Sequence, residues 1–426
     1  MRLSALALLT VVTTSSALVV AACSSDSGGG AGSSGGTTTT PDGSTSETGG
    51  PADPDGGGAD AKVGSDGAPG TDAADGATPP APAVQFIGRF DETDPAGFRM
   101  AWPGSSVVAR FDGTDVSVKL SQTDDGYSAG PSWFNVIVDD VVKTPFSVAG
   151  LAETHVLASG LAPGPHKVEI EKRTEANHGV VRFEGFTFTG GSGLLAPPAR
   201  RAHKLEFVSE STIDGFGVEG NNTTTCIGSA PPQFDNVRKS TAMYTGAGVD
   251  AEVHVTAYSG KGISKNGSPA DDLTMPIMFD RALPDPGAGT PWTHAKWVPE
   301  AIVISLGGVD YGDGVAAAPA DFQTKYTAFV AHLRTVYGNS PYILLTVWSQ
   351  IKNNGGNDQL RAPMEAALDG VVTTRAGLGD TKVSRYSFPE ADPAVETGCY
   401  SHANDAHHQA MAALLVTQLK AKIPGW

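Results

Sequence analysis

Ser211 is the first residue of this sequence whose type and position suggest chemistry. It lies in FVSESTIDGFGVEG, residues 207–220, where an apolar run ends in small polar and acidic residues and glycines follow. A serine hydroxyl is a weak nucleophile, so it needs a base within hydrogen-bond distance and donors for the developing oxyanion. Taken alone, a serine at this position is more often a helix N-cap than a nucleophile.

The C-terminal segment offers the base that such a serine needs. His402 comes just before a strongly amphipathic final helix, and His407 and His408 fall in the first turn of that helix. A histidine on a loop before the last helix can reach a serine at the end of a strand. We therefore predict a pair of Ser211 and His402, against the alternative of a surface histidine near a helix start.

Two patterns of periodicity predict the elements that position this pair. Residues 83–195 contain short stretches that alternate apolar and polar residues, such as FNVIVDDVV and HKVEIEKR, separated by turn signals. This alternation predicts an antiparallel β-sandwich or jelly roll. From residue 200 to 426, compact apolar strands alternate with helical stretches near 234–247, 319–337, 359–376 and 404–422, which predicts a parallel sheet covered on both faces.

In such parallel sheets, ligands bind beyond the carboxyl ends of the strands. Three strand ends carry polar or glycine residues that fit a site there, namely Ser211, Ser259-Gly260 and Gly307 to Asp310. We therefore expect these three segments to lie together at one edge of the sheet.

The N-terminal residues predict export. Residues 1–22 have one basic residue and an uncharged, mostly apolar run, and Val-Ala-Ala-Cys at its end resembles a bacterial lipobox. The resemblance implies cleavage before Cys23, lipid attachment there and a place in the bacterial envelope; an ordinary signal peptide is the alternative. Residues 23–82 contain almost nothing apolar to bury and predict a disordered tether.

Charge and cysteine usage exclude some functions. The formal net charge is −17, without a basic stripe, which disfavours nucleic-acid binding. No CxxC or HExxH motif is present, so we expect neither a metal nor another cofactor. Cys226 and Cys399 remain in the second domain; in an exported chain they predict a disulfide, with two separate buried thiols as the alternative.

The order of four blocks resembles that of SGNH (GDSL-type) hydrolases: the serine block, YSGKG at 258–262, LGGVD at 306–310 and the terminal histidine block. The finer resemblance, over nearly all of residues 84–426, is to carbohydrate esterase family 2. It rests on GRFDETDPAGFRMAWPGSSVVARFDG, KRTEANHG, GFGVEG, TAYSGKGISKN and MPIMFDRALP, and on the GC before the histidine.

The resemblance implies a jelly-roll domain followed by an α/β/α SGNH hydrolase domain that removes acetyl groups from polysaccharides of the xylan or mannan type. It makes Ser211 the nucleophile and His402 the base. The backbone N–H groups of Ser211 and Gly260 would be oxyanion donors, and Cys226 and Cys399 would form a disulfide beside the site. The acetylated polysaccharide would be the partner of a monomeric protein.

The chain departs from the family pattern at the chemistry itself. Gly-Asp-Ser is replaced by Ser209-Glu210-Ser211, and Val309 stands where an asparagine usually donates to the oxyanion. The usual Asp-x-x-His has Cys399 at its acidic position if His402 is the base, which fits family members that work with a Ser–His dyad. A rival assignment uses Asp405 with His408.

These departures leave two functions open. One is a slow or specialised carbohydrate acetyl esterase, and the other is a glycan-binding surface lipoprotein that has lost efficient catalysis. Trp348, after the strand YILLTV, is a candidate for stacking on a sugar ring. Asp310 is a second candidate near the substrate, with hydrogen bonding to loop amides as its alternative role.

Overall fold

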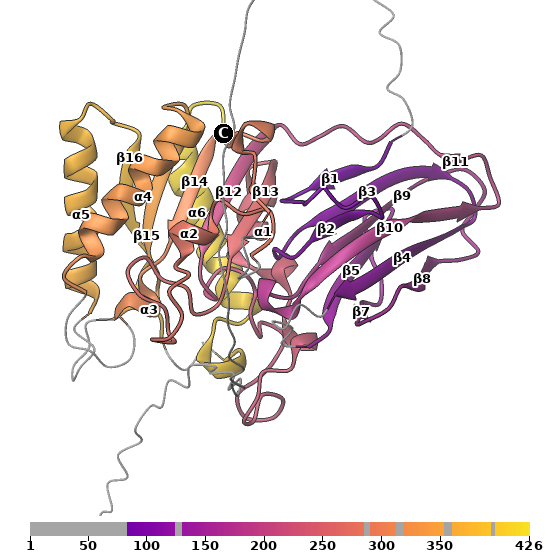
Figure 1. The fold of residues 1–426 in the computed structure, drawn as a ribbon, viewed down its shortest axis with the longest axis horizontal. Coiled ribbons are helices and arrows are strands. Elements are labelled where there is room, and N and C mark those ends of the chain that lie inside the picture. Colours follow the sequence, from indigo (N-terminus) through magenta and orange to yellow (C-terminus); the bar gives the residue numbers. More distant parts are fainter. Residues whose placement is uncertain (1–82, 124–129, 285–289, 312–318, 353–359, 393–396) are drawn as a thin grey trace, which may run out of the picture. The chain divides into compact units, whose positions relative to one another are not determined.

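Figure 1 shows the fold in a computed structural model, which describes residues 83–123, 130–284, 290–311, 319–352, 360–392 and 397–426. The predicted signal peptide (1–22), the predicted lipidation residue Cys23 and the predicted tether (23–82) lie outside the described residues. Among the helices in the described ranges, none has the length and apolar character needed to cross a membrane.

The first part of the described chain is a sandwich of two antiparallel sheets. Its strands are β1 (Gln85–Ile87), β2 (Phe98–Met100), β3 (Ser106–Asp112), β4 (Asp115–Thr123), β5 (Ser132–Val138), β6 (Val141–Val142), β7 (Phe146–Val148), β8 (Glu153–Ala158), β9 (Pro165–Lys172), β10 (Val180–Thr189) and β11 (Gly193–Leu194). Within the described residues, one sheet runs β1-β3-β9-β5-β6, with β11 beside β3 and β7 beside β5, and the other runs β2-β10-β4-β8.

The period-two pattern of the sequence explains how the sandwich closes. Val116, Val118 and Leu120 of β4 alternate with more exposed residues and are buried in the space between the two sheets. Successive side chains of a strand point to opposite faces, so one face of each sheet can bury its apolar residues.

The second part is a parallel sheet between helices. Its strands are β12 (His203–Ser209), β13 (Ala251–Ala257), β14 (Ala301–Ser305), β15 (Tyr342–Val347) and β16 (Val383–Ser387), in the order β13-β12-β14-β15-β16. Its helices are α1 (Thr241–Gly248), α2 (Met275–Met278), α3 (Gly308–Tyr311), α4 (Phe322–Tyr337), α5 (Arg361–Gly377) and α6 (Asp405–Lys422).

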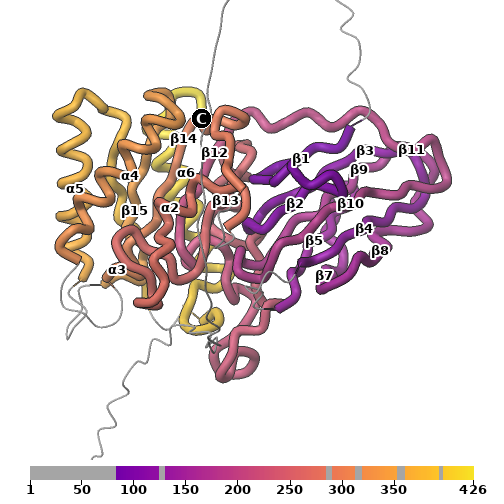
Figure 2. The backbone as a smooth tube through the Cα atoms, viewed as in Figure 1, coloured from indigo at the N-terminus to yellow at the C-terminus, as the bar shows by residue number. Residues whose placement is uncertain are grey.

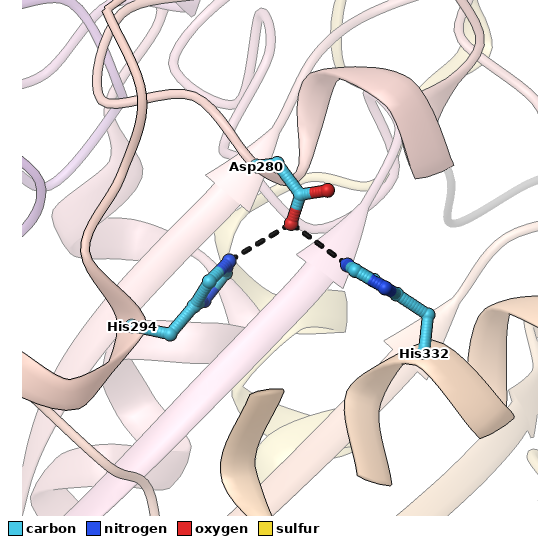
Figure 3. A group of neighbouring side chains, drawn as sticks. All are labelled: Asp280, His294 and His332. Carbon is cyan, nitrogen blue, oxygen red and sulfur yellow. Dashed lines mark hydrogen bonds and ion pairs between the residues drawn. The ribbon is translucent and has the colours of Figure 1, made fainter. Parts of the chain in front are cut away.

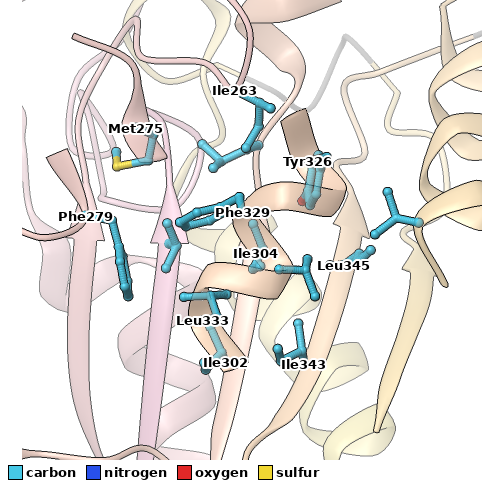
Figure 4. Close-up of a cluster of buried hydrophobic side chains, with 14 of the residues drawn as sticks. Ile263, Met275, Phe279, Ile302, Ile304, Tyr326, Phe329, Leu333, Ile343 and Leu345 are labelled. Carbon is cyan, nitrogen blue, oxygen red and sulfur yellow. The ribbon is translucent and has the colours of Figure 1, made fainter. Parts of the chain in front are cut away.

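Helices cover both faces of the parallel sheet, as Figures 1 and 2 show. On one face, α4 and α5 pack over Ile302, Ile304 and Leu345 (Figure 4). On the other face, α1 and α6 pack over apolar residues that include Phe207 and Leu344. Strands that are apolar on both sides are stable only when both faces are covered, so the predicted α/β/α arrangement is confirmed.

Two elements differ from the prediction. Strand β16 was not predicted, and the helix expected at 234–247 is shorter. Two 3₁₀ turns, Pro232–Phe234 and Val237–Lys239, occupy the first part of that range. The α-helix begins only after Ser240, whose hydroxyl accepts a hydrogen bond from the Met243 N–H and caps the helix.

A buried ion pair joins the sandwich to the parallel-sheet domain. Arg89, next to β1, places Nη2 at 2.7 Å from Oε1 of Glu206 on β12, and the two side chains are 1% and 0% exposed. The same guanidinium donates to the carbonyl oxygens of Phe279 and Arg281 and lies over the Phe279 ring. The Glu206 carboxylate also accepts hydrogen bonds from Thr256 and Tyr337. Each buried charge therefore has several polar partners at this contact between the two domains, which we call the domain seam.

Replacing Arg89 with alanine should destabilise the protein by about 3–5 kcal/mol, because Glu206 is left as an uncompensated buried charge. Denaturant unfolding of the purified protein measures this change. Lys296→Ala is the matched control, since Lys296 and Glu92 form an ion pair of similar length whose side chains are 47% and 43% exposed. We expect the control to change the free energy of unfolding by less than about 1 kcal/mol. Equal effects of the two substitutions would contradict the anchoring role of Arg89.

Candidate active site

Ser211 lies at the topological switch point of the parallel sheet. Strand β12 is the first strand of this sheet in chain order, and β13 pairs on one side of it and β14 on the other. Connections that leave a strand in opposite directions open a crevice beyond its carboxyl end. Because β12 ends at Ser209, Ser211 begins the following series of turns at the mouth of that crevice, where it stays partly exposed.

The structure brings the predicted nucleophile and the predicted base together. Nε2 of His402 lies 2.9 Å from Oγ of Ser211. Nδ1 of the same ring lies 3.2 Å from the carbonyl oxygens of Cys399 and Tyr400. Carbonyl oxygens can only accept, so the proton of neutral His402 is on Nδ1 and Nε2 is left to accept the Ser211 proton. Two backbone carbonyls thus orient the ring in the way that a carboxylate does in a triad.

The environment keeps His402 neutral. Burial lowers the pKa of His402 below its usual value, while the carbonyl oxygens of Tyr400 and Cys399 and the charge of Asp235 oppose this shift. A base must be unprotonated before it can take a proton, so a lowered pKa keeps the pair ready at neutral pH.

The loop that holds His402 has an unusual backbone. Tyr400 and Ser401 have φ values of 50° and 60°, in the left-handed region that non-glycine residues rarely adopt. The reversed chain brings the carbonyls of Cys399 and Tyr400 toward Nδ1 of the following histidine. Conformations of this kind cost of order 1–3 kcal/mol each and persist where neighbouring structure fixes them.

That neighbouring structure is the loop after the nucleophile. Cys226 and Cys399 form a disulfide, and the Cys399 N–H donates to the carbonyl oxygen of Gly217. A Cβ at Gly217 would lie 2.3 Å from Cβ of Cys399, and a Cβ at Gly220 would lie 2.1 Å from its Sγ. Asn222 completes the connection by bonding both the N–H and the hydroxyl of Ser401. The glycines of GFGVEG therefore make room for the disulfide beside the histidine.

The predicted oxyanion donors have their N–H groups available. Within the described residues, the N–H groups of Ser211 and Gly260 donate to no other group. Gly260 has a φ of +74°, which favours glycine at this position. It follows β13 closely, and Tyr258 donates to the carbonyl oxygen of Ser209, so the two loops lie side by side. Which groups bind an oxyanion stays a prediction.

The Ser209-Glu210 replacement is accommodated without backbone strain. Ser209 pairs with strand residues on both sides, its φ is negative, and its hydroxyl donates to the carbonyl oxygen of Ser305 at 3.0 Å. Glu210 is buried and accepts the Val309 N–H at 3.0 Å, with the Gly308 N–H as a second donor. Burial, and then the charge of Asp310, raise the pKa of Glu210 to about 8. Through these hydrogen bonds, Glu210 holds the LGGVD loop against the loop that carries Ser211.

His408 does not contact the serine. It is 1% exposed, and its Nδ1 accepts hydrogen bonds from the N–H and the hydroxyl of Thr241 on α1. Burial lowers the pKa of His408 to about 3. Asp405, the acid of the rival Asp-x-x-His assignment, bonds Tyr244 and Gln409 instead. The structure therefore favours His402 over His408 as the base.

Burial contradicts the two candidates for substrate contact. Trp348 is 3% exposed and packs edge-on against Phe388 in the core beneath α6. Asp310 is 0% exposed, and its carboxylate accepts the N–H groups of the loop residues Ile263, Ser264 and Lys265. Asp310 therefore shapes the loop that follows Gly260, which was its alternative role, and Trp348 packs in the core.

Two other aromatic rings lie beside the pair. The Phe216 ring centroid is 4.6 Å from that of His402 and 6.4 Å from that of Tyr400. Tyr400 is 38% exposed, so its ring is open to a ligand at the site. Neither residue was predicted from the sequence, although Phe216 lies inside the GFGVEG stretch and Tyr400 is two residues before His402.

The sandwich also contributes a side chain to this region. Glu175, on the loop after β9, is 2% exposed and accepts a hydrogen bond from the hydroxyl of Ser259, the residue before Gly260. Burial, then the charges of Asp214 and Asp235, raise the pKa of Glu175. Burial also raises the pKa of Asp214 to about 7, and a hydrogen bond with Glu175 opposes that shift. A protonated Glu175 thus links the Gly260 loop to the loop after the nucleophile.

Comparison with known proteins identifies the scaffold. Residues 86–198 match the family described as carbohydrate esterase 2 N-terminal. A family two carbohydrate esterase from Clostridium thermocellum, solved in complex with cellohexaose, is 33% identical; the match covers 80% of this chain and 99% of that chain with a TM-score of 0.72. The chain belongs to carbohydrate esterase family 2. The predicted resemblance and fold class are therefore confirmed.

Two further relatives extend the comparison. The cellulase/esterase CelE of Acetivibrio thermocellus is 34% identical over 348 residues, which cover 81% of this chain and 40% of CelE. An acetylxylan esterase / glucomannan deacetylase of Cellvibrio japonicus is 28% identical over 352 residues, covering 81% of this chain and 90% of that protein. This family 2 chain thus spans less than half the length of CelE, but most of the length of the Cellvibrio protein.

Substituting Glu175 should slow catalysis from across the domain boundary. Glu175→Ala removes the link between Ser259 and Asp214 and should lower kcat by about ten- to a hundredfold, because a loop misplaced by about 1 Å costs that much. Glu175→Gln can still accept from Ser259 and donate to Asp214, so it should restore most of the rate. Steady-state kinetics with an aryl acetate measure both. A wild-type kcat in Glu175→Ala would contradict this positioning role.

The base can be assigned by comparing two histidine variants. His402→Ala should lower the rate of acetate release by at least about 10³-fold, because Ser211 then has no proton acceptor. His408→Ala removes a buried packing residue and should retain most of the activity below its unfolding temperature. Our assignment is wrong if His408→Ala abolishes acetate release while His402→Ala does not.

Proposed function

We propose that this chain is a carbohydrate O-acetyl esterase that removes acetyl groups from polysaccharides of the xylan or mannan type. One observation carries the proposal, namely the 2.9 Å contact between His402 Nε2 and Ser211 Oγ on a family 2 scaffold. The pairing supports nucleophilic acyl transfer, and the names of the relatives support acetylated polysaccharide as the substrate class.

In the first half of the reaction, His402 Nε2 takes the Ser211 proton while Oγ attacks the carbonyl carbon of the acetyl group. The resulting imidazolium is stabilised through Nδ1 by the Cys399 and Tyr400 carbonyls. The tetrahedral oxyanion accepts hydrogen bonds from the N–H groups of Ser211 and Gly260. His402 then gives its proton to the departing sugar oxygen, and the acetyl group stays on Ser211.

In the second half, water attacks the acetyl-serine. His402 Nε2 takes a proton from this water, the oxyanion forms again at the same donors, and the collapse releases acetate and returns the proton to Ser211 Oγ. His402 needs no carboxylate partner in this cycle, because the carbonyl oxygens of Cys399 and Tyr400 hold its ring in one orientation throughout.

The rings of Tyr400 and Phe216 are the proposed sugar contacts. An aromatic face can cover the apolar face of a pyranose while the sugar hydroxyls stay in water. Tyr400 is next to the His402 backbone and partly exposed, so a sugar that stacks on it has its acetyl ester within reach of the pair.

The location of the enzyme is a further part of the proposal. The Val-Ala-Ala-Cys sequence supports an exported protein, lipid-anchored through Cys23 to the bacterial cell envelope, with residues 23–82 as a tether. We propose that it acts there as a monomer on polysaccharide at the surface, and not on nucleic acid.

Acetate release from acetylated glucomannan and from acetylated xylan tests the proposed activity. The purified protein should release acetate from at least one of them, and Ser211→Ala should release it at least about 10³-fold more slowly. Equal rates for the two proteins would contradict the proposal. Retention of the deacetylated polysaccharide on both proteins would then favour the glycan-binding alternative.

Val309 should limit the rate. Within the described residues its N–H is taken by Glu210, and its side chain has no donor to offer an oxyanion. Loss of one such donor costs about 10²–10³ in kcat in an enzyme where it was tested. Val309→Asn should therefore raise kcat for an aryl acetate by about tenfold or more, whereas Val309→Leu should not. An unchanged rate in Val309→Asn would show that another donor occupies this place.

A further inference from the structure

A cluster of one aspartate and two histidines lies away from the pair of Ser211 and His402. It consists of Asp280, which follows α2, His294, which begins a 3₁₀ turn, and His332, on α4 (Figure 3). Nε2 of each histidine lies 2.8 Å from the same atom, Oδ1 of Asp280. The three atoms lie within 4.8 Å of one another, and the proposed reaction uses none of them.

The hydrogen bonds behind His294 fix where its proton lies. Glu206 is ion-paired with Arg89, so its carboxylate accepts, and the Tyr337 hydroxyl donates to its Oε2 at 2.8 Å. The Tyr337 proton is therefore used, and its oxygen, 3.2 Å from His294 Nδ1, can only accept from the Nδ1–H. Neutral His294 then directs the lone pair of Nε2 toward Oδ1 of Asp280, 2.8 Å away. The lone pairs of these two atoms repel each other at this distance unless a proton or a metal cation lies between them.

We propose that Asp280, His294 and His332 bind a divalent cation of the zinc type. Two imidazole nitrogens and one carboxylate oxygen are a ligand set that zinc accepts, with water in the remaining position. Metal-ligating histidines usually donate their other ring N–H to an oxygen, and for His294 the Tyr337 hydroxyl oxygen is already that acceptor. Nitrogen ligands also select against calcium and magnesium, which prefer oxygen.

The exposure of the three side chains fits an open site. His294 is 10% exposed and fixed, whereas His332 and Asp280 are 36% and 47% exposed. The last two also line a surface depression of about 960 Å³, which gives the cation and its water a route in. Both exposed side chains have room to move apart, as the zinc–nitrogen and zinc–oxygen distances of about 2.0–2.2 Å require.

The position of this site suggests what the cation does. It connects α4 to the segment that carries Phe279 and Trp292, the two rings that lie beside Arg89. Hydrogen bonds also connect this site to the contact between the two domains. His294 contacts the Tyr337 hydroxyl, and that hydroxyl donates to Glu206. The cation therefore stabilises the fold at the seam and takes no part in acyl transfer.

Titration of Zn²⁺ alone into the untagged protein tests the proposal by calorimetry. We expect one high-affinity equivalent, together with an unfolding temperature that rises with zinc concentration, because the cation binds only the folded state. His332→Ala and Asp280→Ala should each weaken zinc binding by at least about tenfold. Ca²⁺ at the same concentrations should neither bind with that affinity nor raise the unfolding temperature.

Two variants serve as controls. His166→Ala removes a histidine that also contacts an aspartate, Asp139, but lacks a second histidine, so zinc affinity should be unchanged. His402→Ala should keep the zinc equivalent, which separates this site from the catalytic pair. His332→Gln, which keeps a polar side chain on α4, should weaken binding like His332→Ala if the ring itself is the ligand. Absence of a zinc equivalent, or equal affinities in His332→Ala and His166→Ala, would overturn the proposal whatever the esterase assays show.

Discussion

The hydrogen bond between Ser211 and His402 is the interaction on which the rest of the site depends. Its two residues are 191 positions apart in the chain and come from different loops at one end of the sheet. A histidine without a carboxylate partner has to be oriented by backbone alone. Backbone orients a ring only if the loop itself is rigid, and the disulfide, the Asn222 contacts and the left-handed Tyr400-Ser401 turn supply that rigidity. Catalysis by this pair is therefore a property of the loop and not only of two side chains.

The sandwich domain is also connected to the loops that form the site. Arg89 joins it to Glu206 in the first strand of the parallel sheet, and Glu175 reaches the hydroxyl of Ser259 beside the proposed oxyanion donor. Both residues are almost fully buried, so they hold the two domains in a fixed arrangement. Through these two contacts the sandwich supports the loops of the hydrolase domain.

Much of this fold could be predicted from the sequence because the signals are local. Strands β12, β13, β14 and β15 are compact apolar runs, and the sandwich strands alternate with period two. Ser211 and His402 could be paired because four short blocks occur in a recognisable order. The position of Ser211 at a strand end and of His402 before the last helix suggested the same pair.

What could not be predicted depends on contacts between distant segments. Trp348 and Asp310 follow strands at the correct end of the sheet, yet burial by α6 and by the loop after Gly260 removes them from substrate. In the sequence Glu175 is a charged residue in a turn, yet in the structure it is 2% exposed and contacts Ser259 of the second domain. The cluster of Asp280, His294 and His332 has separations of 14 and 52 residues from its aspartate, which match no local metal-binding motif.

Labelling with an organofluorophosphonate tests whether His402 activates Ser211, because this reagent reacts with a serine only where a base activates it. We expect mass spectrometry to find the phosphonyl group on the peptide containing Ser211 in the unmodified protein and in His408→Ala. We expect no such label in His402→Ala, although that variant remains folded. A label on another residue, or the same labelling of Ser211 with and without His402, would contradict the assignment of the pair.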